Sequence, residues 1–98
     1  MYRHVVMFTW NDDVDDAHVA ATAAALDALV TTIPEIGDYR HGRDLGLAEG
    51  NSDYVIVGEF ASIDDYVTYR DHPEHRRFIA DHIAGRVSAR AAVQYDAG

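Results

Sequence analysis

The sequence predicts an α+β fold of the ferredoxin-like kind, in which a four-stranded antiparallel sheet carries helices on one face. Three observations predict it. Segments with the two-residue period of strands and segments with the helical period follow one another in the order β-α-β-β-α-β. The 98 residues suffice for one domain over residues 1–98 and leave no room for a second. Hydrophobic residues make up 48% of the chain, so a core can form although the absence of cysteine excludes disulfides.

The first half of the pattern is a strand, a long helix and a second strand. Residues 2–10 are rich in aromatic and β-branched residues, which favours a strand, and both faces of that strand are apolar. Asn11 and the acidic residues after it predict a helix start, because capping side chains and negative charge stabilise the first turn. We expect this helix to run to about Ile33, where Pro34 ends it, and a strand to follow over residues 36–45.

The second half repeats the pattern with an interrupted helix. Residues 53–60 alternate apolar residues on both faces and predict a third strand. Ser62 with Asp65 resembles a capping box and opens the next helix. Pro73 interrupts that helix, since the residue before a proline avoids the helical conformation. The elements expected here are helices over residues 63–70 and 74–84 and a last strand over residues 86–96.

One face of the predicted sheet has no helix to cover it. Val5 and Met7 in the first strand, and Val55 and Val57 in the third, lie on the face opposite to the helices. Because no further element of the chain remains to cover these apolar residues, a second copy of the subunit is the simplest cover. We therefore expect a homodimer in which two sheets pack face to face.

The charge of the chain argues against two classes of partner. Seventeen acidic residues against eight basic ones give a net charge of −9, which repels phosphates and anionic lipids, so neither nucleic acid nor a membrane is expected. No stretch approaches the roughly 20 apolar residues of a membrane-spanning helix. The N-terminal segment lacks the small-residue cleavage site of a signal peptide, so we expect a cytoplasmic protein.

Two histidines are predicted to meet inside the fold. His75, Phe78, Ile79 and His82 follow the helical spacing, so His75 lies on the inward face, and His4 shares its strand face with large apolar residues. A space with a few polar groups in an aromatic lining is typical of a small-molecule site. A desolvated, neutral histidine there can act as a base, although each inward histidine could equally be a packed core residue. His18 and His41 lie among polar residues and are expected at the surface or an edge.

Other chemistries find less support. His72, His75 and His82 could be metal ligands, but Pro73 interrupts their helical face and no acidic residue completes the set, so we predict no metal and no other cofactor. The serines lack the Gly-x-Ser-x-Gly context of a nucleophile. Neither a phosphate-binding glycine-rich loop nor a dinucleotide-binding fingerprint is present.

Three segments carry a family resemblance. They are His-Val-Val-Met-Phe at residues 4–8, Tyr-Val-Thr-Tyr-Arg-Asp-His-Pro-Glu-His at residues 66–75 and Val-Gln-Tyr-Asp at residues 93–96. With the predicted topology they resemble the stress-responsive dimeric α/β barrel (Dabb) family over essentially the whole chain. The resemblance implies a homodimer whose two sheets form a central barrel.

The resemblance also implies catalytic residues. Matched to the plant polyketide cyclase of that family, the catalytic histidine falls on His75, its supporting tyrosine on Tyr69 and a pocket histidine on His4, whereas a further pocket histidine is replaced by Tyr54. By resemblance, His75 would remove a proton next to a carbonyl, and Tyr69 would orient His75 or stabilise the enolate. The residues expected to contact a substrate are Phe8, Tyr54, Phe60, Phe78, Ile79 and His82.

Three functions follow as hypotheses. The first is a cofactor-free cyclase- or lyase-like enzyme that acts on a small carbonyl or polyketide-like molecule. The second is a stress-associated small-molecule-binding or structural dimer without catalysis. The third is a cofactor-free or haem-degrading monooxygenase of the same fold, which rests on Trp10, the histidines and fold analogy. An open cavity beside His75 would favour the first, and a space filled by aromatic side chains the second.

Overall fold

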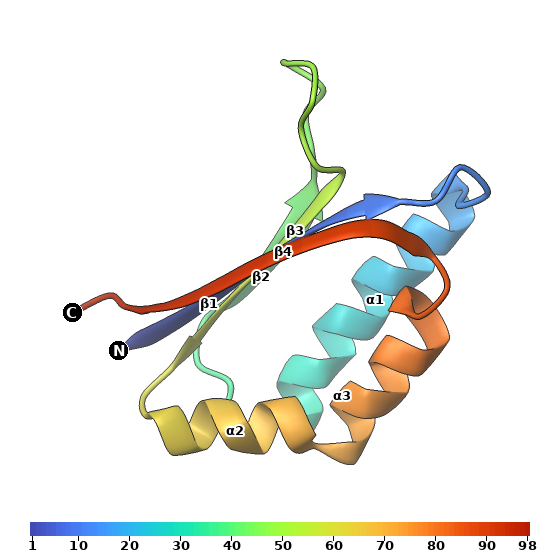
Figure 1. The fold of residues 1–98 in the computed structure, drawn as a ribbon. Coiled ribbons are helices and arrows are strands. Elements are labelled where there is room, and N and C mark those ends of the chain that lie inside the picture. The colour runs from blue at the N-terminus through green and yellow to red at the C-terminus, as the bar shows by residue number, and fades with distance from the viewer.

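The computed structural model describes all residues, Met1 to Gly98, and confirms the ferredoxin-like βαββαβ order. The four strands form one antiparallel sheet in the order β2-β3-β1-β4. The helices lie on one face of this sheet (Figure 1). The strands are β1 (Tyr2–Trp10), β2 (Tyr39–Arg43), β3 (Tyr54–Phe60) and β4 (Val87–Asp96). The helices are α1 (Asp16–Thr32), α2 (Ile63–Asp71), α3 (Pro73–Phe78) and the π-helical turn η1 (Ile79–Ile83).

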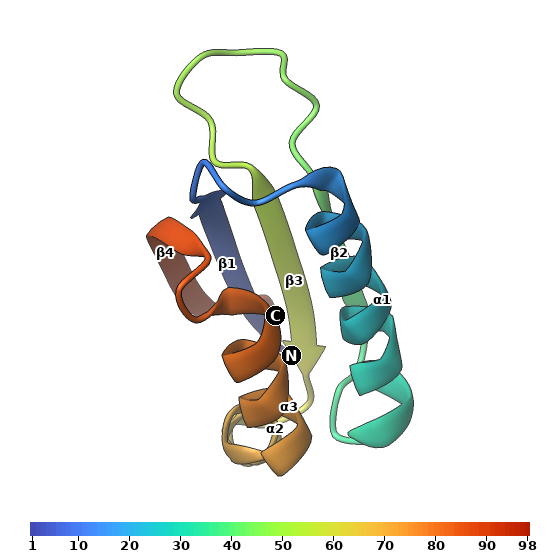
Figure 2. The same cartoon turned by 90° about the vertical axis from the view of Figure 1, so that its right-hand side faces the viewer.

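Two elements are shorter than the sequence predicted. Helix α1 begins at Asp16, because Asp15 caps it by accepting a hydrogen bond from the backbone N–H of His18 at 2.8 Å, while Asn11 belongs to the preceding turn. Strand β2 has only five residues, since pairing with β3 starts at Tyr39 and stops at Arg43. The chain between β2 and β3 extends beyond the end of the sheet as a long loop (Figure 2).

The interruption at Pro73 is present and orients two helices. His72 has the extended backbone that a following proline favours, with φ −60° and ψ 135°, and its Nδ1 accepts the N–H of Glu74 at 3.1 Å. His72 therefore ends α2 and caps α3. After Phe78 the helix widens into η1, and Gly85, whose φ of 74° favours glycine, leads the chain into β4.

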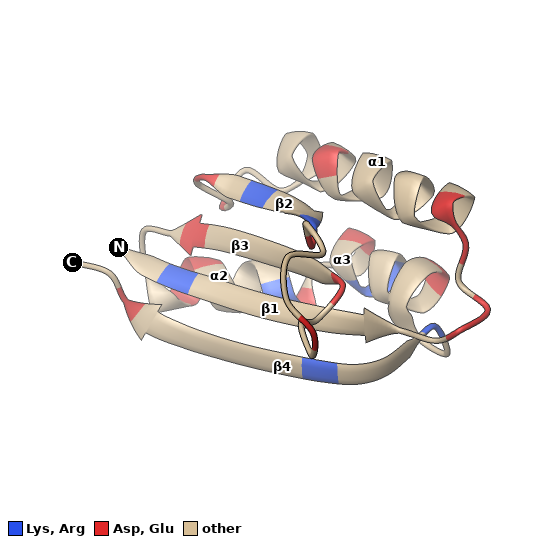
Figure 3. Ribbon diagram, turned by 90° about the horizontal axis from the view of Figure 1, so that it is seen from above, with Lys and Arg blue, Asp and Glu red and all other residues tan.

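The core lies between the sheet and the helices. Its largest fully buried side chains are Phe60, Leu26 and Ile33, contributed by β3, α1 and the end of α1. The opposite face of the sheet has no covering element: the register sets Val5 beside Val57 and Val93, and Val93 is 55% exposed. Figure 3 shows no charged residue along the middle of β1 and β3. No helix combines the length and the apolar character needed to cross a membrane.

Candidate active site

A cavity of about 270 Å³ lies between the sheet and the helices α2, α3 and η1. Strands β1, β3 and β4 form one wall, and α2, α3 and η1 form the other. Among the predicted site residues, those that line it are His4, Phe8, Tyr69, His75, Phe78 and Ile79. His75, in the cavity lining, is partly exposed. Its remaining polar residues are Tyr66, Arg70 and Arg90, and it contains no acidic side chain.

His75 has a defined proton arrangement. It sits in the first turn of α3, and its Nδ1 lies 3.0 Å from the backbone oxygen of Arg70. Because a carbonyl oxygen only accepts hydrogen bonds, Nδ1 carries the proton and Nε2 keeps a free electron pair. Burial lowers the pKa of His75 below its usual 6.5, so the ring is neutral at pH 7. Nε2 of His75 is therefore able to accept a proton.

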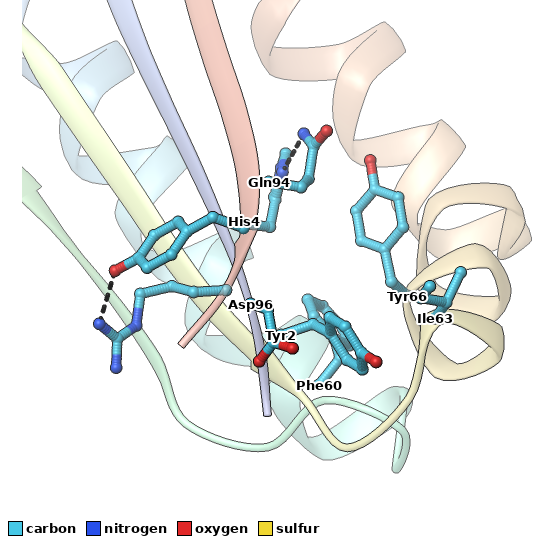
Figure 4. Close-up of a pocket in the computed structure, with 9 residues that line it drawn as sticks. Tyr2, His4, Phe60, Ile63, Tyr66, Gln94 and Asp96 are labelled. Carbon is cyan, nitrogen blue, oxygen red and sulfur yellow. Dashed lines mark hydrogen bonds between the residues drawn. The ribbon is translucent and has the colours of Figure 1, made fainter. Parts of the chain in front are cut away.

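His4 has the opposite arrangement. It is 6% exposed in the middle of the site, and its Nδ1 lies 2.8 Å from the Nε2 amide of Gln94, its partner residue on β4 (Figure 4). The amide N–H donates, so Nδ1 accepts and the ring proton lies on Nε2. Desolvation, assisted by the charges of Arg90 and His75, lowers the pKa of His4 to about 4. His4 is therefore a neutral hydrogen-bond donor.

Tyr69 connects the site to a second tyrosine. Its side chain is 2% exposed, and its ring packs on the ring of His75 with 4.3 Å between the centroids. Its hydroxyl is hydrogen-bonded to the hydroxyl of Tyr39 at 2.8 Å. Burial raises the pKa of Tyr69 to about 12, so the phenol stays protonated at neutral pH. Tyr69 thus contacts His75 through its ring, and its hydroxyl contacts Tyr39.

A second hollow adjoins the cavity. It has a volume of about 380 Å³ and shares His4 and Tyr66 with the first cavity. Figure 4 shows its walls, with Tyr66 and Ile63 on the helical side and Tyr2 and Asp96 near the chain ends. Phe60, which is fully buried, lines this hollow instead of the first cavity.

Two further predicted substrate contacts, Tyr54 and His82, line neither hollow. The hydroxyl of Tyr54 lies 2.7 Å from Nδ1 of His41, whose Nε2 lies 2.7 Å from Asp27, because β3 pairs with β2 and β2 lies beside α1. His82 packs beside His18, with 5.7 Å between the ring centroids. The helical period predicted His82 beside His75, but the wider turn η1 rotates it away.

The remaining histidines take structural positions. His41 lies on the edge strand β2, where its two ring nitrogens contact Tyr54 and Asp27. His18 hydrogen-bonds the backbone oxygen of His82 at 2.9 Å. His72 caps α3. No three histidine or acidic side chains of the chain converge so that they could hold a metal ion.

Sequence reasoning missed four residues of the site. Gln94 and Arg90 could have been found by pairing the first and last strands, since they then face the side of His4 and Phe8. Tyr66 lies one helical turn before Tyr69. Tyr39 carried no signal, because its contact with Tyr69 depends on how β2 packs against the helices.

Comparison with known proteins shows the family. The model of the stress responsive A/B barrel domain (Dabb) matches residues 2–97. A dimeric ferredoxin-like protein of unknown function from Thermobifida fusca is 41% identical with a TM-score of 0.89, over 96% of this chain and 88% of that one. No curated protein matches the chain.

More distant structures share the fold alone. A hydroxynitrile lyase from Passiflora edulis is 17% identical with a TM-score of 0.85, over 96% of this chain and 90% of that one. A putative antibiotic biosynthesis monooxygenase from Nitrosomonas europaea is 16% identical with a TM-score of 0.76, over 98% and 97% of the two chains. With its sequence matched from Tyr2 to Ala97, the chain belongs to the stress responsive A/B barrel (Dabb) family.

Proposed function

We propose that this protein is a cofactor-free enzyme that moves a proton next to the carbonyl group of a small, polyketide-like molecule, in a cyclase- or lyase-like reaction. The observation that carries the proposal is the pair of neutral histidines in one cavity, with a free electron pair on Nε2 of His75 and a proton on Nε2 of His4. A base and a hydrogen-bond donor on one substrate are what proton abstraction beside a carbonyl requires.

In the proposed reaction, Nε2 of His75 takes the proton from the carbon next to the carbonyl. The electron pair of that C–H bond forms the enolate, whose oxygen accepts hydrogen bonds from Nε2–H of His4 and from the hydroxyl of Tyr69. The enolate carbon then attacks a second carbonyl of the same molecule, and the imidazolium of His75 returns its proton to the new alkoxide. The reverse sequence breaks a carbon–carbon bond. One neighbour of the same fold is a hydroxynitrile lyase, which agrees with lyase-like chemistry.

A homodimer is the second part of the proposal. The exposed apolar face of the sheet needs a cover, and two neighbours of 41% and 27% identity are described as dimeric. Two such faces packed together would bury Val5, Val57 and Val93 while leaving the cavity on the helical side accessible.

The test follows deuterium exchange at the carbon next to the carbonyl of methyl 4-oxopentanoate and acetophenone, by NMR in heavy water. We expect the wild-type protein to accelerate exchange and His75→Ala to lower the rate by at least about a hundredfold. His82→Ala, a change in the same helical segment but outside the cavity, should retain the rate. No exchange above background would overturn the enzyme proposal, and a large loss of melting temperature in His75→Ala as well would favour the binding or structural dimer.

A further inference from the structure

One arginine differs from the others in having no partner. Six of the eight arginines contact a carboxylate, and Arg86 hydrogen-bonds Nδ1 of His18 at 3.3 Å. Arg90 has neither an ion pair nor a side-chain hydrogen bond. The six arginines with a carboxylate partner are Arg3, Arg40, Arg43, Arg70, Arg76 and Arg77. In a chain with seventeen acidic residues, an arginine without a carboxylate partner is notable.

The free arginine belongs to the wall of the active-site cavity. Arg90 is the single basic residue of β4, visible as the blue segment of that strand in Figure 3. It pairs with Phe8 of β1, and directly paired residues leave an antiparallel sheet on the same side, so Arg90 points to the helical side. It lines the cavity together with His4 and His75, and its charge lowers the pKa of His4.

The cavity around Arg90 lacks any group that would neutralise it. The lining contains no acidic residue, and the second arginine, Arg70, is held by Asp71 at 3.0 Å. A guanidinium presents two parallel N–H donors that match the two oxygens of a carboxylate. One free cation, without a second one or a nest of backbone N–H groups, suits a singly charged anion better than a phosphate dianion.

We propose that Arg90 binds a carboxylate of the substrate, so that the enzyme acts on small carbonyl compounds that are also carboxylic acids. The inference rests on the proposed function and names its substrate class. With the carboxylate at Arg90, the carbonyl end extends along β1 toward His4 and His75. The positive charge of Arg90 also attracts anionic substrates to a cavity in a molecule of net charge −9 that otherwise repels them.

The test compares 4-oxopentanoate with its methyl ester, by exchange rate and by NMR titration of binding. We expect the wild-type protein to prefer the acid in kcat/KM, and Arg90→Gln to lower the acid's value by about tenfold more than the ester's, so that the preference disappears. Arg86→Gln, which removes the other arginine without a carboxylate, is the matched control and should keep the preference.

The outcomes separate the two proposals. Equal kcat/KM for acid and ester in the wild-type protein would overturn the role of Arg90, as would a preference for the acid that survives in Arg90→Gln. In either case, His75-dependent exchange of the ester would still support the enzyme proposal. If neither compound exchanges, the binding titration still tests Arg90. Tighter binding of the acid than of the ester, lost in Arg90→Gln, supports carboxylate recognition without the reaction. If the wild-type protein binds neither compound, carboxylate recognition by Arg90 is overturned. Tighter binding of acetonylphosphonate than of 4-oxopentanoate would also contradict the assignment of a carboxylate.

Discussion

His4 and Gln94 lie 90 residues apart in the sequence and face each other across β1 and β4, with 2.8 Å between the imidazole Nδ1 and the amide Nε2. This contact determines which nitrogen of His4 carries the proton. A buried histidine without such a partner could adopt either tautomer, and only the one with Nε2–H can donate a hydrogen bond from that atom. Gln94 is therefore a positioning residue of the proposed site.

Gln94→Glu should reverse the tautomer of His4. The carboxylate only accepts hydrogen bonds, so it would bind Nδ1–H and also raise the pKa of His4. We expect the exchange rate to fall by about tenfold, because a hydrogen bond to the developing enolate is lost. Nitrogen NMR of His4 reports the tautomer directly. An unchanged tautomer in Gln94→Glu would contradict this role, and Gln94→Asn serves as the control that keeps the amide.

The stability of the protein should fall on acidification because of His4. Its pKa is lowered from 6.5 in the unfolded chain to about 4 in the fold, so between these values the unfolded state binds more protons. The contribution is present above pH 6.5 and is lost as the pH falls toward 4, by up to about 3 kcal/mol. Urea unfolding across this range measures it. His4→Gln should show a flatter pH dependence, and a slope equal to that of the wild type would contradict the assignment.

The exchange rate should rise with pH and reach its plateau below neutrality. The proposed base, His75, must be neutral to accept a proton, and burial lowers its pKa below 6.5. We expect kcat/KM with methyl 4-oxopentanoate to climb through an apparent pKa below 6.5 and to stay level up to pH 8. A rate that falls as the pH rises through 6 would mean that the protonated imidazole is the active form.

The fold could be read from the sequence because its signals are local. Strand alternation, the apolar stripe of α1 and the proline at position 73 each act within a few residues, and each led to the element that the structure contains. The open sheet face followed from the same alternation, since Val5 and Met7 have no helix above them. The predicted lengths of α1 and β2 were wrong. A side-chain cap determines where α1 begins, and the extent of pairing with β3 determines where β2 begins and ends.

The site was less predictable because it combines distant segments. His4 and His75 were identified from faces of their own elements, and the structure places both on one cavity. The predicted position of His82 beside His75 differs from the structure, because a single π-helical turn changes the helical spacing. No pattern in the sequence indicated that turn. Tyr39 and Gln94 act through contacts 30 and 90 residues along the chain, so they appear only when β2 and β4 are in place.

Tyr39→Phe should affect the reaction from outside the cavity. Tyr39 does not line the cavity, but its hydroxyl is hydrogen-bonded to that of Tyr69 at 2.8 Å. Removing it leaves a buried hydroxyl without its partner, at a cost of about 1 kcal/mol in the free energy of unfolding. If Tyr69 stabilises the enolate, the exchange rate falls several-fold in Tyr39→Phe and no further in the double variant with Tyr69→Phe. Additive losses in the double variant would show that the two hydroxyls act independently.

Val57→Asp should dissociate the proposed dimer. Val57 lies in the centre of the open sheet face, paired with Val5 of β1 and Arg40 of β2, so an aspartate there would place a carboxylate in the apolar interface of the proposed dimer. Sedimentation of the wild-type protein should give about twice the monomer mass of 10.9 kDa, and the variant should sediment as a monomer with a lower melting temperature. Val30→Asp is the matched control, because Val30 is also partly exposed but lies on α1, away from the sheet face. A wild-type protein that sediments as a stable monomer would contradict the face-to-face dimer, as would a Val57→Asp variant that keeps the dimer mass.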